Sequence, residues 1–277
     1  MQNSIQTNFY LNRYEFSNQE IFIAPQGDLN MVVVIPCFKE PHLIESLASI
    51  LACDLPLKAT EVIVVVNCSE MAEEELKQQN QIAFDEAKQW SIKHSSEKLI
   101  FHVIKHLDLP KKHAGVGLAR KIGMDEAVRR LEWVNNPNGI IVCFDADSKV
   151  DTNYLVEIEK HFKNNTKTTA CSIHYEHPLE GALENVHYTG IINYEMHLRY
   201  YIHALKYAGY INAYQTIGSS MAVRSLIYQK QGGMNRRKAG EDFYFLHKII
   251  PLDNFSEIKS TRVIPSPRQS DRVPFGT

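Results

Sequence analysis

Two pairs of acidic residues in the sequence have the types and spacing of metal-binding or catalytic carboxylates. Asp145 and Asp147 follow an apolar run in "VCFDADSKVD", and Glu241 and Asp242 are adjacent in "AGEDFYF". A turn after Asp145 would bring the first two carboxylates near one ion, and oxygen ligands favour hard cations such as Mg²⁺ or Mn²⁺. A carboxylate beside a reacting hydroxyl can act as a general base. The residues therefore indicate a metal site and a proton acceptor.

Each pair also fits a purely structural role. An aspartate at the end of a strand often closes an Asx turn, and acidic residues in the first turn of a helix stabilise its dipole by roughly 0.3–1 kcal/mol each. Taken alone, either pair favours the structural interpretation. The choice depends on the elements that position the pairs and on the motifs around them.

Apolar runs of strand length alternate with helical patterns along the first half of the chain. The expected strands are 31–36, 62–67, 99–105 and 139–144, and the expected helices between them are 41–52, 73–94 and 117–133. This alternation predicts an α/β fold with a mostly parallel sheet covered by helices on both faces. Ligands of such sheets bind at the carboxyl ends of the strands, and the Asp145 pair lies at one of those ends.

The second half of the chain has a different character. We expect strands at 168–175 and 216–224, helices at 185–210 and 241–250, and a late strand in "STRVIPSP". The second-half helix is rich in tyrosine, which is typical of core packing or of a helix–helix contact, and tyrosines at this spacing can also line a binding groove. No Pro/Gly/Ser-rich linker separates the halves, so we predict one domain over 1–277, with a first half at about 31–150 and a second half at about 151–277.

Composition narrows the function classes. The formal net charge is -2, so overall charge favours neither nucleic acid nor an anionic membrane as a partner. No apolar run approaches the ~20 residues of a membrane-spanning helix, and the polar N-terminus has no signal-peptide pattern. The 5 cysteines lie apart, mostly in apolar segments, as expected for buried thiols in a reducing compartment. We therefore predict a cytoplasmic location, with peripheral contact at the inner face of the membrane left open.

Six segments occur in an order that resembles the family-2 glycosyltransferases of the GT-A fold. They are "VVVIPCFKE", "VVVNCSE", "GVGLARKIGMDEAV", "FDADS", "GSSMAVRSLIYQKQGGM" and "AGEDFYFLHKI", and they extend from about residue 31 to about residue 250. The resemblance implies a Rossmann-like central sheet flanked by helices, with a smaller acceptor-side subregion. It implies that the half at about 31–150 binds the nucleotide-sugar, and that the half at about 151–277 binds the acceptor, where the tyrosines could stack on sugar rings. It also implies an inverting, metal-dependent transfer of a sugar from a nucleotide-diphosphate sugar, with a UDP-sugar as the default donor. The implied acceptor is a hydroxyl of a glycan or lipid-linked glycan, as in cell-wall or polysaccharide biosynthesis.

The resemblance also assigns roles to the acidic pairs. Asp147 would hold Mn²⁺ or Mg²⁺, and Asp145 would lie near the ribose or share the ion. Asp242 would be the catalytic base, and Glu241 would position the acceptor or the helix. A dication on the first pair would offset the repulsion between two crowded carboxylates and stabilise charge on a leaving diphosphate.

Donor-binding roles are implied for residues in four further segments. The first-strand loop would cradle the nucleoside, the second-strand loop would face the base or ribose, an arginine early in the third expected helix would reach the diphosphate or base, and arginines near the C-terminus would close over the diphosphate. The residues are Pro36, Cys37, Phe38, Glu40, Asn67, Ser69, Gly117, Arg120, Arg268 and Arg272.

Two other functions remain as alternatives. A sugar-phosphate nucleotidyltransferase usually carries a glycine-rich loop directly after its first strand, and "PCFKEPH" contains no glycine. A non-catalytic protein that binds nucleotide-sugars or serves as a scaffold could keep the same fold, but all four acidic residues of the two pairs are retained here.

Overall fold

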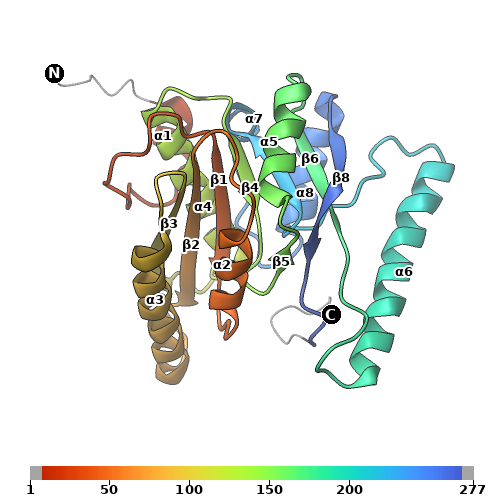
Figure 1. Ribbon diagram of the computed structural model, residues 1–277, viewed down its shortest axis with the longest axis horizontal. Helices are drawn as coiled ribbons and strands as arrows, with labels where there is room; N and C mark the ends of the chain where they lie inside the picture. Colours follow the sequence, from red (N-terminus) through yellow and green to blue (C-terminus); the bar gives the residue numbers. More distant parts are fainter. Residues whose placement is uncertain (1–7, 270–277) are drawn as a thin grey trace.

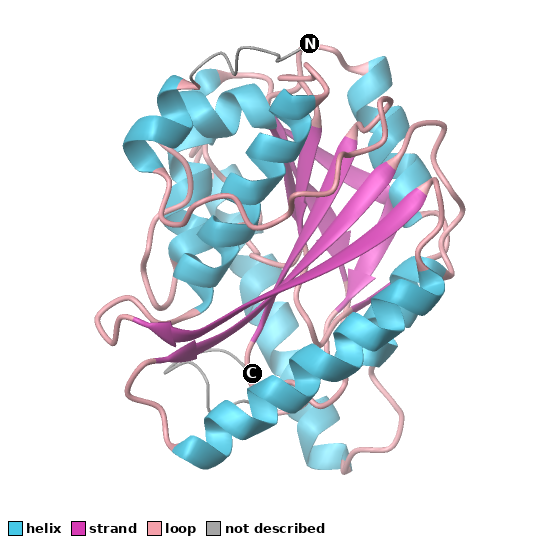
Figure 2. Ribbon diagram, turned by 90° about the vertical axis from the view of Figure 1, so that its left-hand side faces the viewer, coloured by secondary structure: helices cyan, strands magenta, loops and turns pink. Residues whose placement is uncertain are grey.

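The computed structural model describes residues 8–269, which form one eight-stranded sheet with helices on both faces (Figures 1 and 2). The strands are β1 (Met31–Cys37), β2 (Thr60–Ser69), β3 (Leu99–Leu109), β4 (Ile140–Cys143), β5 (Lys149–Val150), β6 (Ala170–Tyr175), β7 (Met221–Arg224) and β8 (Ser256–Ile264). The helices are α1 (Phe9–Tyr14), α2 (Leu43–Leu51), α3 (Glu74–His94), α4 (Val116–Trp133), α5 (Tyr154–Asn164), α6 (Asn185–Tyr207), α7 (Ser225–Lys230), α8 (Glu241–Ile249) and the short 3-10 helix η1 (Ile250–Leu252).

The strand order is β3-β2-β1-β4-β7-β6-β8-β5. β1 runs parallel to β2 and β4, and β2 runs parallel to β3. β7 is antiparallel to both of its neighbours, β4 and β6, and β8 continues parallel to β6. This pairing confirms the predicted mostly parallel α/β sheet. It also places the carboxyl ends of β1, β4, β6 and β8 at one edge.

The central strands are apolar at every position because both of their faces are buried. In β1, Val33 and Ile35 pack in the core under α2, α3 and α5, while Val32 and Val34 pack under α4, α7 and α8. Two separate cores therefore sandwich the sheet, as expected when helices cover both faces. Gly123 lets α4 approach closely, since a Cβ there would lie 2.4 Å from Val34 Cγ1.

Several boundaries differ from the sequence-based prediction. The strand expected at 216–224 is confined to β7, because the residues before it form a loop, and the late strand begins at Ser256 rather than within "STRVIPSP". The tyrosine-rich helix ends at Tyr207, three residues early. Helices α1, α5 and α7 and the two-residue strand β5 were not predicted.

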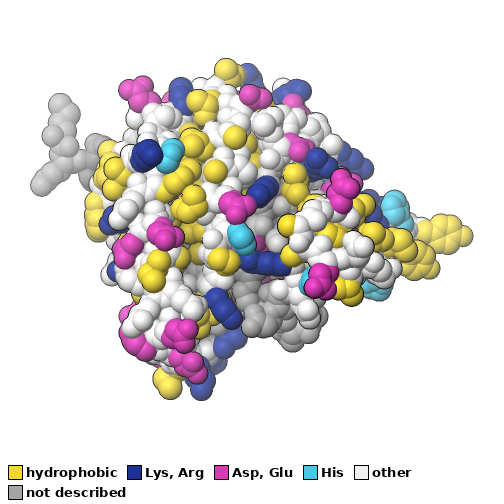
Figure 3. Space-filling model, turned by 60° about the horizontal axis from the view of Figure 1, so that its bottom comes forward, with side chains coloured by type: hydrophobic (Ala, Val, Ile, Leu, Met, Phe, Trp, Pro, Cys, Tyr) yellow, Lys and Arg dark blue, Asp and Glu magenta, His cyan; other side chains and the backbone are white. Residues whose placement is uncertain are grey.

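Helix α6 lies at one side of the molecule, beyond β8 in Figure 1. One stripe of the helix faces the sheet, and only Tyr188, Ile191 and Glu195 of it are buried. Most of its tyrosines are exposed, so core packing is the wrong interpretation for that series. Figure 3 shows hydrophobic side chains gathered at the right-hand end of the molecule, over α6. The exposed apolar residues of the helix are Val186, Ile192, Met196, Tyr200, Tyr201 and Tyr207.

The cysteines are as expected. All five are buried, and none forms a disulfide. Within residues 8–269, no helix is both long and apolar enough to cross a bilayer.

Candidate active site

The Asp145 pair lies in a tight turn at the carboxyl end of β4. β4 ends at Cys143, and the Ser148 amide donates to the Asp145 carbonyl oxygen at 3.1 Å, which closes the turn. The Ser46 hydroxyl, from α2, lies 2.7 Å from the Ala146 carbonyl oxygen and 2.6 Å from that of Ser148. Because the Ser46 hydroxyl contacts two carbonyl groups of this turn, it holds Asp145 and Asp147 at the edge of the sheet rather than on a free loop.

A single buried arginine joins this turn to the second acidic pair. Arg120, in the first turns of α4, is 1% exposed. Its Nη2 donates to Asp145 Oδ1 at 2.5 Å, and its Nη1 donates to Glu241 Oε1. Burial acts to lower the pKa of Arg120, but the charges of Asp145 and Glu241 outweigh burial and raise it above its ordinary value. The sequence alone was compatible with a solvent-exposed charge at position 120. In the structure the Arg120 side chain is instead buried, and it joins the two acidic pairs through ion pairs with Asp145 and Glu241.

Two glycines make room for this arrangement. A Cβ on Gly117 would lie 2.2 Å from the Arg237 carbonyl oxygen and 3.0 Å from Glu241 Cβ. A Cβ on Gly218 would lie 2.6 Å from Arg120 Nη1. Without a side chain at Gly117, α4 packs closely against the segment that leads into α8; the donor-site role of Gly117 stays a prediction. Gly218, in the "GSSMAVR" segment, was not singled out from the sequence.

Glu241 and Asp242 form the first turn of α8, after Gly240 in the left-handed conformation (φ 67°). Glu241 is buried, and burial raises its pKa to about 6 against the opposing charge of Arg120. Asp242 is half-buried, and burial raises its pKa as well, while the charge of Arg120 and the hydrogen bond from the Phe243 amide act to lower it. The helix-dipole interpretation is compatible with these positions, but the raised pKa values are typical of carboxylates at functional sites.

The loop after β1 supplies a second ionic contact. Glu40 is buried, accepts a hydrogen bond from the His42 amide at 3.0 Å, and accepts another from Arg268 Nη2. The same Arg268 nitrogen lies 3.5 Å from Asp147 Oδ2. The structure therefore brings Arg268 to the Asp145–Asp147 turn, from 228 residues further along the chain than Glu40. Arg272, predicted for the same role, lies outside the described residues.

The remaining donor-site candidates lie at the ends of β1 and β2. Pro36 and Cys37 are buried within β1, and Phe38 is half-buried beyond it. Asn67 Nδ2 donates to the Cys37 carbonyl oxygen at 2.8 Å, so this contact ties the two strand ends together. Ser69, at the end of β2, accepts from the Met71 amide. These residues share one edge of the sheet with the acidic pairs, and their donor-binding roles stay predictions.

The charges at this edge fit a divalent cation. Five carboxylates and two guanidinium groups interact there: Glu40, Asp145, Asp147, Glu241 and Asp242 with Arg120 and Arg268. Within this set of seven groups the carboxylates outnumber the guanidinium groups by three. Asp145 and Asp147 supply hard oxygen ligands, and the Asp147 charge contributes to the raised pKa of Asp145, behind the larger effect of burial.

The same residues do not enclose an ion by themselves. No cluster of three or more His, Cys, Asp or Glu with metal-binding geometry occurs in the described part of the chain. Two carboxylates that leave the remaining positions to water and substrate phosphates are the usual protein contribution to a Mg²⁺ site in phosphate chemistry. The residues present therefore fit an ion that protein and diphosphate hold together.

Comparison with known proteins identifies the family. The family model described as "Glycosyl transferase family 2" matches residues 32–230. Among solved structures, S. aureus TarS 1-349 in complex with UDP-GlcNAc aligns with a TM-score of 0.57 at 15% identity, covering 88% of this chain and 60% of that one. Its UDP complex aligns with a TM-score of 0.54 at 13% identity, with 86% and 60% covered.

Full-length S. aureus TarS aligns with a TM-score of 0.53, and this chain spans 37% of it. No curated protein matches the chain. The structural matches show a GT-A fold, and the sequence match covers well over half of the residues. The chain belongs to glycosyl transferase family 2.

Proposed function

We propose that this protein transfers a sugar from a nucleotide-diphosphate sugar, with a UDP-sugar as donor, to a hydroxyl group of a glycan or lipid-linked acceptor. The observation that carries the proposal is the ionic chain Asp145–Arg120–Glu241, which fixes the turn at the end of β4 beside Asp242. Such a chain holds a diphosphate-facing carboxylate and a candidate base at one edge of the sheet. The similar S. aureus TarS 1-349 was crystallised in complex with UDP-GlcNAc, which supports UDP as the nucleotide.

Asp242 is proposed to accept the proton of the attacking hydroxyl. Its carboxylate is half-buried at the start of α8, and Oδ1 already accepts the Phe243 amide at 2.7 Å. A raised pKa suits a general base, because a base is most effective when its pKa approaches the working pH. Attack from the side opposite the leaving group would invert the anomeric carbon.

Arg120, Asp145 and Asp147 are proposed to serve the leaving group. A divalent ion on the two aspartates would stabilise the negative charge that develops on the departing UDP. Arg268, which already contacts Glu40 and lies near Asp147, is placed to pair with phosphate oxygens through its planar guanidinium. Burial fixes the Arg120 guanidinium, so it orients Asp145 without reorganising during the reaction.

The test is release of UDP from UDP-sugars with and without Mn²⁺. We expect metal-dependent release in the native protein and a fall of about 10²–10⁴-fold in Asp242→Asn, the range typical of a lost general base. Asp28→Asn is the matched control, because Asp28 forms an exposed surface pair with Lys98 away from the site. Donor binding without turnover against any acceptor would instead favour a non-catalytic nucleotide-sugar-binding protein.

A further inference from the structure

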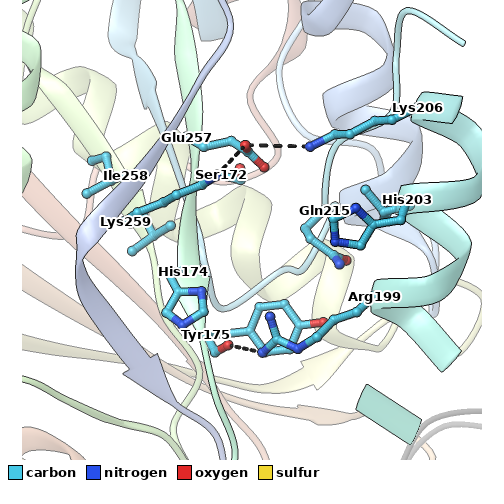
Figure 4. A pocket seen from close by; sticks show the side chains of 12 residues that line it. Ser172, His174, Tyr175, Arg199, His203, Lys206, Gln215, Glu257, Ile258 and Lys259 are labelled. Atoms are coloured by element: carbon cyan, nitrogen blue, oxygen red, sulfur yellow. Dashed lines mark hydrogen bonds and ion pairs between the residues drawn. The ribbon is translucent and has the colours of Figure 1, made fainter. Parts of the chain in front are cut away.

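The outward face of helix α6, on the side away from the sheet, contains no Lys, Arg, Asp or Glu. The helix has three such residues, Glu195, Arg199 and Lys206, and all three lie toward the sheet. Glu195 is buried and pairs with Arg199 at 2.6 Å. Lys206 Nζ lies 3.7 Å from Glu257 Oε2, on β8. Figure 4 shows Arg199 and Lys206 pointing from α6 toward β6 and β8. A helix face in contact with water normally carries charged and polar residues, so the uncharged face indicates a surface that a partner covers.

The apolar part of this face is large enough for a stable interface. Its exposed apolar residues are Val186 (67%), Ile192 (39%), Met196 (62%), Tyr200 (74%), Tyr201 (53%) and Tyr207 (97%). At about 200 Å² for a tyrosine and about 100 Å² for an aliphatic residue, these fractions amount to roughly 600 Å². The largest apolar patch of a typical monomer covers about 300–600 Å². One partner of a standard interface contributes about 800 Å², of which roughly 60% is apolar, so this face alone meets the requirement.

The size of the side chains changes along the face. Val186, Thr189, Gly190 and Asn193 occupy its N-terminal half, and Met196, Tyr200 and Tyr207 occupy its C-terminal half. The three larger residues lie on one stripe because their spacing follows the helical period. A two-fold axis beside Met196 would pair α6 with the same helix of a second copy in the antiparallel direction. Tyr207 of one copy would then lie over Val186 of the other, and Tyr200 over Asn193. Large side chains would meet small ones, which is the self-complementarity that an isologous interface needs.

We propose that the outward face of α6 binds the same face of a second copy of this chain, and that the two antiparallel helices form a symmetric dimer. A strongly charged partner does not fit, because the face has no charge to complement. A membrane surface fits less well than a second copy. Helices that lie on membranes carry Lys and Arg on their polar face, whereas Arg199 and Lys206 are held by carboxylates on the side that packs against the sheet. The inference is independent of the proposed function.

The first test is the molar mass of the chain, measured by sedimentation equilibrium across the micromolar range. Tyr200→Glu/Tyr207→Glu is compared with Phe22→Glu/Ile23→Glu, which places two carboxylates on an exposed apolar pair outside α6. Phe22 and Ile23 are each 74% exposed, so both double variants should keep the native urea midpoint. We expect the native chain and the control to approach twice the mass of one chain. The tyrosine variant should dissociate with a constant at least about a hundredfold higher, because the interface would bury four carboxylates without partners.

A second test addresses the antiparallel geometry through cross-linking. All five native cysteines are buried, so an introduced exposed thiol reports the contact. Met196→Cys, beside the proposed axis, should give a disulfide-linked dimer on mild oxidation with copper–phenanthroline. Tyr207→Cys should not, because about 30 Å would separate it from its symmetry mate along the helix axes. Cross-linking of Tyr207→Cys in place of Met196→Cys would overturn the antiparallel arrangement.

Two outcomes of the mass measurement overturn the dimer itself. One is a native chain that stays monomeric across the range, and the other is a tyrosine variant that dimerises as tightly as the control. If the native chain is monomeric and floats with phosphatidylcholine vesicles, while Tyr200→Glu/Tyr207→Glu does not, the occupant of the face is a lipid surface instead of a second copy.

Discussion

Replacing Arg120 with methionine should destabilise the fold far more than the loss of a surface ion pair. The guanidinium is 1% exposed and bridges Asp145 and Glu241, and Glu241 is itself only 4% exposed. Methionine fills a similar volume, so the main effect is a buried carboxylate without its cation. Breaking a buried ion pair in this way costs about 3–5 kcal/mol, which is a large share of the ~5–15 kcal/mol by which domains are stable.

The assay is urea unfolding followed by circular dichroism, arranged as a double-mutant cycle. Glu241→Met alone leaves Arg120 paired with Asp145, which retains 37% side-chain exposure. The double variant removes the buried pair and leaves Asp145 accessible to water, so we expect it to lose less stability than the sum of the single variants. The coupling between contacting charges should fall at about 1–3 kcal/mol.

Arg262→Met is the matched control. Arg262 also contacts two carboxylates, Asp151 and Glu176, but its side chain is 43% exposed. Exposed pairs contribute about 0–1 kcal/mol because water and salt screen them. If Arg120→Met costs no more than this control, or if the two single variants add without coupling, the claim that a buried ionic chain organises the site is wrong.

Three further predictions concern the same edge of the sheet. Gly218→Ala should displace Arg120, because the new Cβ would lie 2.6 Å from Nη1, and should cost about 1–3 kcal/mol by overpacking; an unchanged urea midpoint would contradict this. Asp147→Asn should weaken Mn²⁺-dependent UDP binding, measured by calorimetry, about ten- to a hundredfold, which is the range for a lost contact to a charged group. When EDTA removes the metal, the variant and the native protein should bind UDP with equal residual affinity. Burial raises the pKa of Asp242, and a general base works only when it is ionised. The value of kcat/KM for sugar transfer should therefore fall as the pH falls through a value above the ordinary aspartate range. A fall of kcat/KM only within the ordinary aspartate range would refute the assignment of Asp242 as the base.

Much of the fold follows from patterns that local physics explains. β1 alternates between two cores, so a run of consecutive apolar residues was enough to predict a strand buried on both faces. Helix α5 was missed although it has a usable signal: Tyr154, Leu155, Ile158 and Phe162 are its apolar face at helical spacing. Strand β5 has two residues and offers no periodicity to detect.

The site was predictable only in part. The carboxylates were visible because acidic residues at the end of an apolar strand are unusual enough to draw attention. The partnership of Arg120 with Glu241 was not, since 121 residues separate them and the register of α4 against α8 depends on packing at Gly117. The contact between Arg268 and Glu40 spans still more of the chain. Sequence motifs thus marked which residues meet, whereas the pairing among them is a tertiary property.

The pairing matters because it connects the two chemical tasks of the site. In the proposed function Asp145 would face the diphosphate and Asp242 the acceptor, and both carboxylates lie in the field of the same buried guanidinium. Without that positive charge, burial would raise the pKa of Asp242 further and leave the base protonated over a wider pH range. In the proposed mechanism Arg120 would therefore have two roles: it would orient the carboxylate that serves the leaving group, and it would favour the ionised form of the base. A chain that folds α4, β4 and α8 around one arginine cannot alter either half of the site without changing the electrostatics of the other.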